Sequence, residues 1–318
     1  MVTKITNFAF IIGTGRCGST MLAQILNSHS IICVPHELQI LFEYSNNGHR
    51  LHEIFKEKKN ECFDSKDFIE LIEAKCPHKF HEYFDYKSFF EKQQYPIHSL
   101  KELANSLFAE IAKSKHKKIF IEQTPWYGQR IDILNGLFPD AKYIHMVRDG
   151  RDVAISFART PWWSNNIGEN LEKWYAEVKQ IIDSSNKILN PNQILQVRYE
   201  DFVAQPESEL KRICDFLVID FEEAMLDPTT HIDYSLYRKS DIRNVSSAAL
   251  NEWVKNKNTS VFKESRYAWK KHHGYDFTSI PDHIKQSLES LGYETKKNYM
   301  ATLHSLLIAV RNLVHKGF

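Results

Sequence analysis

Residues 8–26 constrain the fold most strongly, because they combine a short apolar run, a glycine-rich turn and the start of a helical pattern. The run at residues 8–12 predicts a buried strand that ends at Gly13. Beyond Gly18, apolar residues recur at helical spacing at Met21, Leu22, Ile25 and Leu26. A glycine loop between a strand and a helix start exposes backbone N–H groups to an anion, and the helix dipole favours negative charge there. The stretch therefore predicts a phosphate-binding loop.

This loop departs from the nucleotide P-loop pattern G-x-x-x-x-G-K-[ST] at one position. Gly13, Gly18 and Thr20 fit the pattern, but Ser19 stands where a lysine would contact the β- and γ-phosphates. The cation in the loop is Arg16. The loop thus suits a phosphate-rich ligand and suits Walker-type ATP hydrolysis poorly, which leaves an ATP-dependent P-loop kinase as a less favoured alternative.

Alternation of strand and helix patterns predicts the fold class. Four further short apolar runs predict strands at residues 31–34, 118–122, 142–147 and 194–198. Helical patterns separate them, so we expect an α/β fold with a parallel central sheet and helices on both faces. We expect one domain over residues 1–318, with a helical insertion or cap at 45–116 and an amphipathic C-terminal helix at 296–318.

Composition narrows the classes of function. A net charge of +1 argues against a general nucleic-acid binder. The five cysteines are scattered, with no C-x-x-C pair and no metal-ligand spacing, which predicts reduced thiols and no metal site. No apolar run reaches the ~18 residues of a membrane span, and the simplest compartment is cytoplasmic.

Cys17, at a helix start beside Arg16, is expected to favour its thiolate and to react rapidly with alkylating agents.

Charged and polar residues follow two of the predicted strands, at the sheet edge where ligands of parallel α/β folds bind. His36 and Glu37 follow the second run; Glu37 is the candidate functional residue, and His36 is a reserve whose alternative role is a solvated loop residue. Arg148 ends the fourth run, and Ser156 lies eight residues later, about two helical turns on. This pair suits a second phosphate. The alternative is a network of surface ion pairs that contributes little to the stability of the fold. Its members would be Arg148, Asp149, Arg151 and Asp152.

Three motifs together resemble those of sulfotransferases that use 3′-phosphoadenosine 5′-phosphosulfate (PAPS). The loop Gly13-x-x-Arg16-Cys17-Gly18-Ser19-Thr20 resembles the family's 5′-phosphosulfate loop, with an arginine as in the tyrosylprotein and bacterial branches. Residues 147–156 resemble the 3′-phosphate motif, and residues 197–202 resemble the next strand and turn. The resemblance covers about residues 6–40 and 117–220.

The resemblance implies transfer of a sulfuryl group from PAPS to a hydroxyl or amine, with PAP as product and without a metal ion. It implies that Glu37 is the general base, that Arg16 stabilises the leaving 5′-phosphate and that Gln123 lies near the transferring group. Glycan-modifying relatives often have a lysine in place of Gln123, which carries no charge. The implied nucleotide-binding residues are Thr14, Gly15, Arg16, Cys17, Gly18, Ser19, Thr20, Arg148, Ser156, Tyr199 and, in a late basic segment, Lys263.

The acceptor and the partners stay open at the level of sequence. A glycan, a peptide, a lipid or a small molecule would each fit the chemistry, and a non-catalytic PAP(S)-binding protein is the main alternative to an enzyme. The apolar stripe of the C-terminal helix favours docking onto the domain first, self-association into a homo-oligomer next and attachment to a membrane surface last.

Overall fold

The computed structural model describes most of the chain, namely residues 8–35, 37, 38, 41, 69, 85–92, 99–160, 163–227 and 266–295. Two candidate site residues, His36 and Lys263, lie outside the described residues, as does the expected helix at 296–318. Within the expected insertion, the described segments form two helices, α4 (Tyr86–Glu91) and α5 (Leu100–Ser114).

The centre of the molecule is a parallel five-stranded sheet with the order β2-β3-β1-β4-β5. The sheet confirms the predicted fold class and all five predicted strands, which are β1 (Phe8–Gly13), β2 (Ile32–Cys33), β3 (Ile119–Glu122), β4 (Lys142–Val147) and β5 (Ile194–Arg198). The chain builds β2 and β3 on one side of β1 and then crosses to β4 on the other side. Ligands of such sheets bind outside the carboxyl ends of the strands where the strand order reverses, which here is the end of β1.

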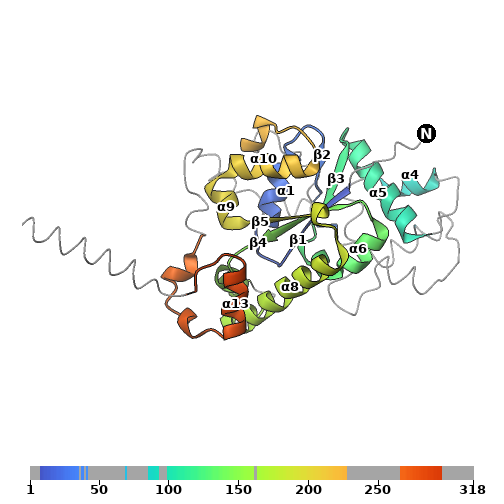
Figure 1. Ribbon diagram of the computed structural model, residues 1–318. Helices are drawn as coiled ribbons and strands as arrows, with labels where there is room; N and C mark the ends of the chain where they lie inside the picture. The colour runs from blue at the N-terminus through green and yellow to red at the C-terminus, as the bar shows by residue number, and fades with distance from the viewer. Residues whose placement is uncertain are drawn as a thin grey trace, which may run out of the picture.

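Helices cover both faces of the sheet (Figure 1). One face carries α1 (Ser19–Asn27), α9 (Tyr199–Ala204) and α10 (Pro206–Leu217). The other face carries α5, α6 (Ile131–Leu137) and the long α8 (Ile167–Ile188). The remaining described elements are α7 (Gly150–Ala158), α13 (Asp282–Ser290) and the 3-10 turns η1 (Pro125–Arg130), η2 (Pro191–Gln193), η3 (Glu223–Leu226), η6 (Ala268–Lys271) and η7 (Phe277–Ser279).

Side-chain alternation along β1 explains the two layers. Ala9 and Ile11 are buried with the residues of α1 and α10, whereas Phe10 and Ile12 are buried with those of α5 and α8. Successive side chains of a strand point to opposite faces, so a strand that is apolar at every position needs cover on both. β1 is such a strand, and it lies at the centre of the sheet.

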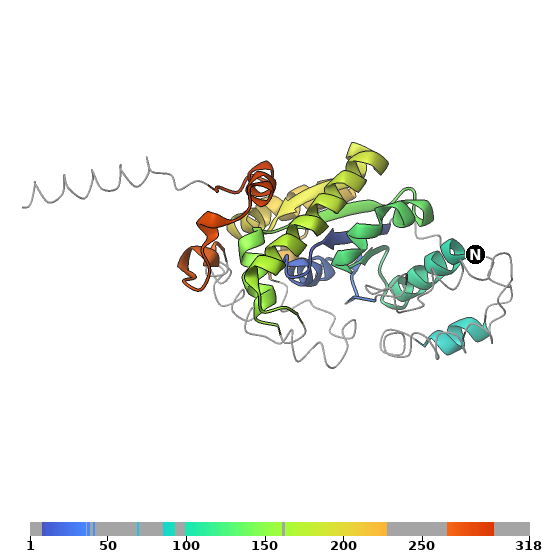
Figure 2. The ribbon, with the colours of Figure 1, turned by 90° about the horizontal axis from the view of Figure 1, so that it is seen from below.

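The C-terminal segment 266–295 packs beside α7 and α8, and forms the third hydrophobic cluster with them (Figures 1 and 2). Trp174 of α8 is fully buried at its centre. Gly150, the first residue of α7, touches this indole so closely that a Cβ atom would lie 2.4 Å from Trp174 Cδ2. A glycine at this position therefore lets α7 begin directly against α8.

The amino ends of the strands carry a cavity of about 320 Å³, lined by Phe8, Ala9, Ile119, Asp140, Lys142, Leu217 and Val218. It lies at the edge of the sheet opposite the end of β1 that is expected to bind ligands.

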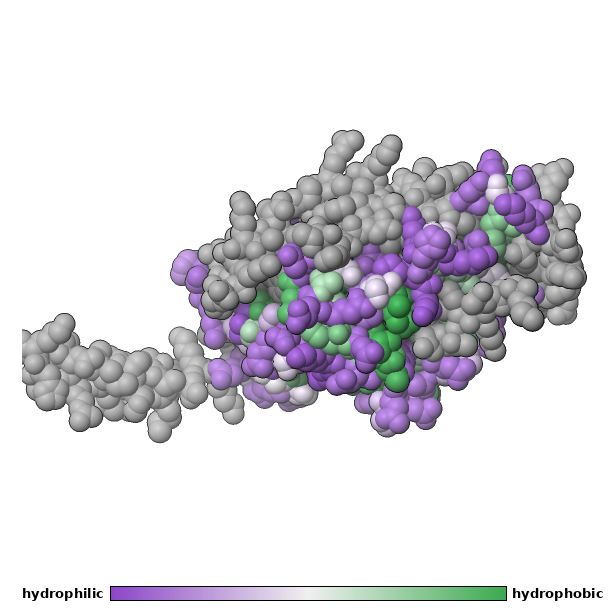
Figure 3. Space-filling model, turned by 90° about the horizontal axis from the view of Figure 1, so that it is seen from above, coloured by the Kyte–Doolittle hydropathy of each residue, from purple (hydrophilic) through white to green (hydrophobic). Residues whose placement is uncertain are grey.

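Seen from above, the described surface is mainly hydrophilic, with apolar residues in small areas (Figure 3), as is usual for folded domains. None of the described helices combines the length and the apolar character required to cross a membrane.

The expected reactivity of Cys17 is wrong. The side chain is 0% exposed and belongs to the core cluster beneath α1, so it faces the protein interior instead of the ligand side of the loop. Burial raises the pKa of the Cys17 thiol to about 11, and the hydrogen bonds from Ser19 and the charge of Arg148 offset only part of this effect. The thiol is thus the favoured form.

We expect Cys17 in the native protein to react with iodoacetamide at pH 8 at least tenfold more slowly than in the urea-unfolded chain, because access and thiolate formation are both suppressed. Labelling of each cysteine can be followed by peptide mass spectrometry. Fast labelling of native Cys17 that is blocked by PAP would contradict this burial.

Candidate functional site

The loop that joins β1 to α1 has the backbone of an anion-binding turn. Arg16 and Gly18 both adopt left-handed conformations, with φ angles of 64° and 99°. A Cβ atom on Gly18 would lie 2.6 Å from Cδ2 of Tyr199, so the close approach of the tyrosine ring also requires glycine. Ser19, Thr20 and the following residues begin α1, which places free backbone N–H groups at the loop.

The loop is in direct contact with α7 and with Arg148, which follows β4, at the carboxyl edge of the sheet. Arg16 Nε donates a hydrogen bond to Ser156 Oγ at 2.9 Å. An Arg148 guanidinium nitrogen donates to the backbone carbonyl of Arg16 at 3.1 Å. Three residues that the sequence assigned to two separate phosphate motifs are thus brought together across more than 130 positions of the chain.

Two like charges lie side by side in this site. Partial burial and the neighbouring positive charge of Arg148 lower the pKa of Arg16. The Arg148 guanidinium also stacks on the ring of Tyr199, with 4.5 Å between its Cζ and the ring centroid. Because two adjacent guanidinium groups repel each other, a multiply charged anion bound between them would relieve the repulsion.

The other loop residues take different positions. Thr14 and Ser19 are buried, and Gly15 touches Phe157 of α7, since a Cβ there would lie 2.7 Å from Phe157 Cζ. Gln123, which follows β3, is fully buried and donates a hydrogen bond from Nε2 to Ser19 Oγ at 3.2 Å. Gln123 therefore lies directly behind the first turn of α1.

A pair of carboxyl groups lies on the β2–β3 side of the loop. Glu37 is partly exposed, and its charge interacts with Arg16. Glu122, the last residue of β3, is 1% exposed and accepts a hydrogen bond from Thr124 Oγ1 at 2.7 Å. Burial, together with the nearby charge of Glu37, raises the pKa of Glu122 to about 8. The residue is thus protonated in most molecules at pH 7.

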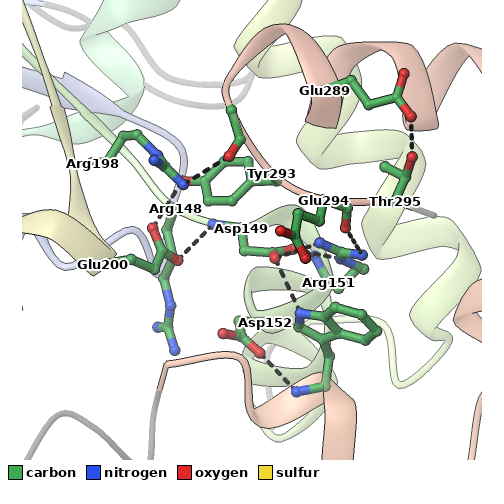
Figure 4. A network of polar contacts seen from close by, with 12 residues as sticks. Arg148, Asp149, Arg151, Asp152, Arg198, Glu200, Glu289, Tyr293, Glu294 and Thr295 are labelled. Atoms are coloured by element: carbon green, nitrogen blue, oxygen red, sulfur yellow. Dashed lines mark hydrogen bonds and ion pairs between the residues drawn. The ribbon is translucent and has the colours of Figure 1, made fainter. Parts of the chain in front are cut away.

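The four residues considered as a surface Arg–Asp network are, apart from Arg148, almost completely buried. Arg151 pairs with both carboxylate oxygens of Asp149, at 2.9 Å from Nε and 2.7 Å from a terminal nitrogen. The surface interpretation is wrong for these residues because the C-terminal segment covers them: the guanidinium of Arg151 lies 3.7 Å from the ring centroid of Trp269. Figure 4 shows that the Arg148 side chain extends away from this cluster.

Trp269 joins the C-terminal segment to both aspartates of the motif. Its backbone N–H donates to Asp152 at 2.9 Å, and its indole N–H donates to Asp149 at 3.1 Å. Burial, together with the charge of Asp149, raises the pKa of Asp152 to about 6. The N-cap of α7 is Asp149, so the same carboxylate fixes the helix start, the ion pair and the docked segment.

Glu200 of α9 completes the network. It is fully buried, accepts from the backbone N–H of Asp149 at 3.0 Å and from the Tyr293 hydroxyl at 2.9 Å (Figure 4). Burial raises its pKa. The Arg198 guanidinium also stacks on the ring of Tyr293, with 4.4 Å between its Cζ and the ring centroid. Through these contacts the ends of β4 and β5 and the C-terminal segment are held in one arrangement.

Sequence reasoning missed Glu122, Glu200, Trp269 and Tyr293. Glu122 carried a usable signal, since an acidic residue that ends a short apolar run lies at the ligand edge of a parallel sheet. Trp269 and Tyr293 carried none, because their partners are more than 90 positions away in the chain. Among the described residues, no group of three or more His, Cys, Asp or Glu side chains is arranged to hold a metal ion.

Similar proteins have been described in bacteria and animals. The chain is 34% identical over 133 residues to Protein-tyrosine sulfotransferase A of Caenorhabditis elegans, an alignment that covers 38% of this chain and 35% of that protein. It is 25% identical over 152 residues to the omega-hydroxy-beta-dihydromenaquinone-9 sulfotransferase Stf3 of Mycobacterium bovis, covering 43% of this chain and 39% of that protein. These alignments therefore span well under half of either relative.

The fold matches a solved domain along nearly its whole length. The sulfotransferase domain of the Synechococcus PCC 7002 olefin synthase superposes with a TM-score of 0.60 and 23% identity, covering 91% of this chain and 95% of that domain. At this identity the likeness concerns the fold alone. The model of the Sulfotransferase family matches residues 9–223, which is more than half of the chain. This chain belongs to the sulfotransferase family.

Proposed function

We propose that this protein transfers a sulfuryl group from PAPS to a hydroxyl or amine of an acceptor. The observation that carries the proposal is the contact between Arg16, Ser156 and Arg148, at 2.9 and 3.1 Å, which joins the two phosphate motifs into one cationic site. A ligand with phosphates at both its 5′ and 3′ positions fits two phosphate motifs in contact, whereas ATP and ADP have no 3′-phosphate.

The positions of the side chains suggest which part of PAPS each of them would bind. The backbone N–H groups at the start of α1 and the Arg16 guanidinium would bind the 5′-phosphosulfate. Arg148 and Ser156 would bind the 3′-phosphate and so distinguish PAPS from ATP. Tyr199 would hold the Arg148 guanidinium through the stacking contact already described.

Transfer would proceed in line. The acceptor oxygen or nitrogen attacks sulfur, the bond between sulfur and the 5′-phosphate oxygen breaks, and PAP leaves. Glu37 would take the proton of the acceptor, and Arg16 would stabilise the negative charge that develops on the leaving phosphate. Gln123 would add hydrogen bonding but no positive charge, and its amide already supports Ser19.

The names of the two similar proteins, a tyrosine and an omega-hydroxylated menaquinone sulfotransferase, favour a hydroxyl acceptor. Screening phenols, including tyrosine peptides, and long-chain primary alcohols for acceptor-dependent release of PAP would test both classes.

We expect Arg148→Ala to weaken PAP binding at least tenfold, because it removes the charge that faces the 3′-phosphate. Calorimetric titration without magnesium measures PAP and ADP against the same protein, and the native protein should bind PAP much more tightly than ADP. Arg159→Ala, at an exposed position after the same helix, is the matched control and should bind PAP normally. Equal affinity for PAP and ADP, or binding of ATP only with magnesium, would overturn the proposed cofactor.

We expect Glu37→Gln to lower kcat for sulfuryl transfer by about 10²- to 10⁴-fold, since general-base catalysis contributes a factor of this size. Affinity for PAP at pH 7 should be retained, because the substitution removes only a negative charge. The exposed Glu207→Gln serves as control. An unchanged kcat would remove Glu37 from the mechanism. PAP binding without transfer to any acceptor would instead identify a non-catalytic PAP(S)-binding protein.

A further inference from the structure

Glu122 is a buried carboxyl group that the mechanism above does not use. It ends β3 at the ligand edge of the sheet, it precedes the fully buried Gln123, and the charge of Glu37 interacts with it. Thr124 Oγ1 donates to its Oε1 at 2.7 Å, while Oε2, also buried, has no hydrogen-bond partner among the described residues. A buried oxygen without a partner is costly as part of an anion and much less so as a hydroxyl.

The charged groups around Glu122 favour its neutral form. Glu37, from the segment after β2, faces it with a like charge. Arg16, from the loop after β1, interacts with Glu37. Thr124 supplies hydrogen bonding that favours the anion, but burial outweighs this contribution. A second carboxylate here would also repel the bound nucleotide, which carries several negative charges.

We propose that Glu122 is a positioning residue that works with its carboxyl group protonated. In this form it adds no second negative charge beside the Glu37 carboxylate and leaves the phosphate loop able to bind a polyanionic nucleotide. The buried Oε2 has no hydrogen-bond partner among the described residues, and ionisation would place a negative charge there. The inference rests on the proposed function, because it takes PAP as the bound anion.

Titration of PAP binding between pH 7 and 9.5 tests this role. The Kd of the native protein for PAP should rise by about tenfold over this range as Glu122 ionises. Proton binding and PAP binding are linked, so a tenfold change in Kd corresponds to a difference of about one between the pKa of Glu122 in the PAP complex and in the free protein. Glu122→Gln, which keeps a neutral side chain of the same size, should bind PAP at pH 7 as well as the native protein and lose this rise. The exposed Glu207→Gln is the matched control and should keep it.

Two further variants should shift the pH midpoint of the rise in Kd in opposite directions. They test the role of Glu122 even if Glu122→Gln fails to fold. Thr124→Val removes a hydrogen bond that favours the Glu122 anion, so the midpoint should move to higher pH. Glu37→Gln removes the neighbouring charge, so the midpoint should move to lower pH. A merely structural role of Glu122 would produce neither displacement.

The outcomes separate the inference from the proposed function. Tight PAP binding at pH 7 with the same rise of Kd in the native protein and in Glu122→Gln would overturn the role of Glu122 and leave the proposed function intact. A pH-independent Kd in the native protein, or unmoved midpoints in Thr124→Val and Glu37→Gln, would do the same. Absence of PAP binding at every pH would overturn the proposed function and this inference with it.

Discussion

The parallel register between β1 and β4 is the constraint on which the site depends. Ile12 lies opposite His145 and Gly13 opposite Met146, so the two strands end at nearly the same level. The chain leaves each strand through a polar loop and enters a helix, α1 after β1 and α7 after β4. Both helices therefore begin at the same edge of the sheet, and Arg16 reaches Ser156, which lies about two turns into α7. A slip by one residue would turn the side chains of β4 to the opposite face and break this alignment.

A second constraint is the buried ion-pair network beneath the two phosphate motifs. Asp149, Arg151 and Glu200 are each at most 2% exposed, and such charges are tolerated only when every one of them has partners. Their partners come from the start of α7, from α9 and from the C-terminal segment, so the network connects separate elements. Truncation of one member would leave its partner charged, buried and unpaired, and such losses typically cost about 3–5 kcal/mol. The residues at the surface of the site therefore lie over a part of the interior that is itself polar.

Local patterns in the sequence were sufficient for the fold. The apolar runs predicted all five strands. In α10, which begins at Pro206, the buried residues Leu210, Ile213, Cys214 and Leu217 recur at helical spacing, which is again a local pattern. The phosphate loop and Arg148 could be recognised because a glycine pattern and a strand end are both local signals. The role of Cys17 was misjudged because sequence position gives the distance from a helix start but not the direction of a side chain. The burial of Arg151 and Asp152 escaped prediction for another reason: the segment that covers them lies more than 100 residues away.

The docking of Trp269 and Tyr293 has a consequence for how the chain folds. The helix that carries Ser156 is capped by Asp149, and the carboxylates of Asp149 and Glu200 find their final donors only in residues 266–295. On a ribosome, where the chain emerges from its N-terminus, the sheet can assemble while these donors are still being synthesised. The site would therefore mature last, through contacts of long sequence separation that form slowly compared with local helices.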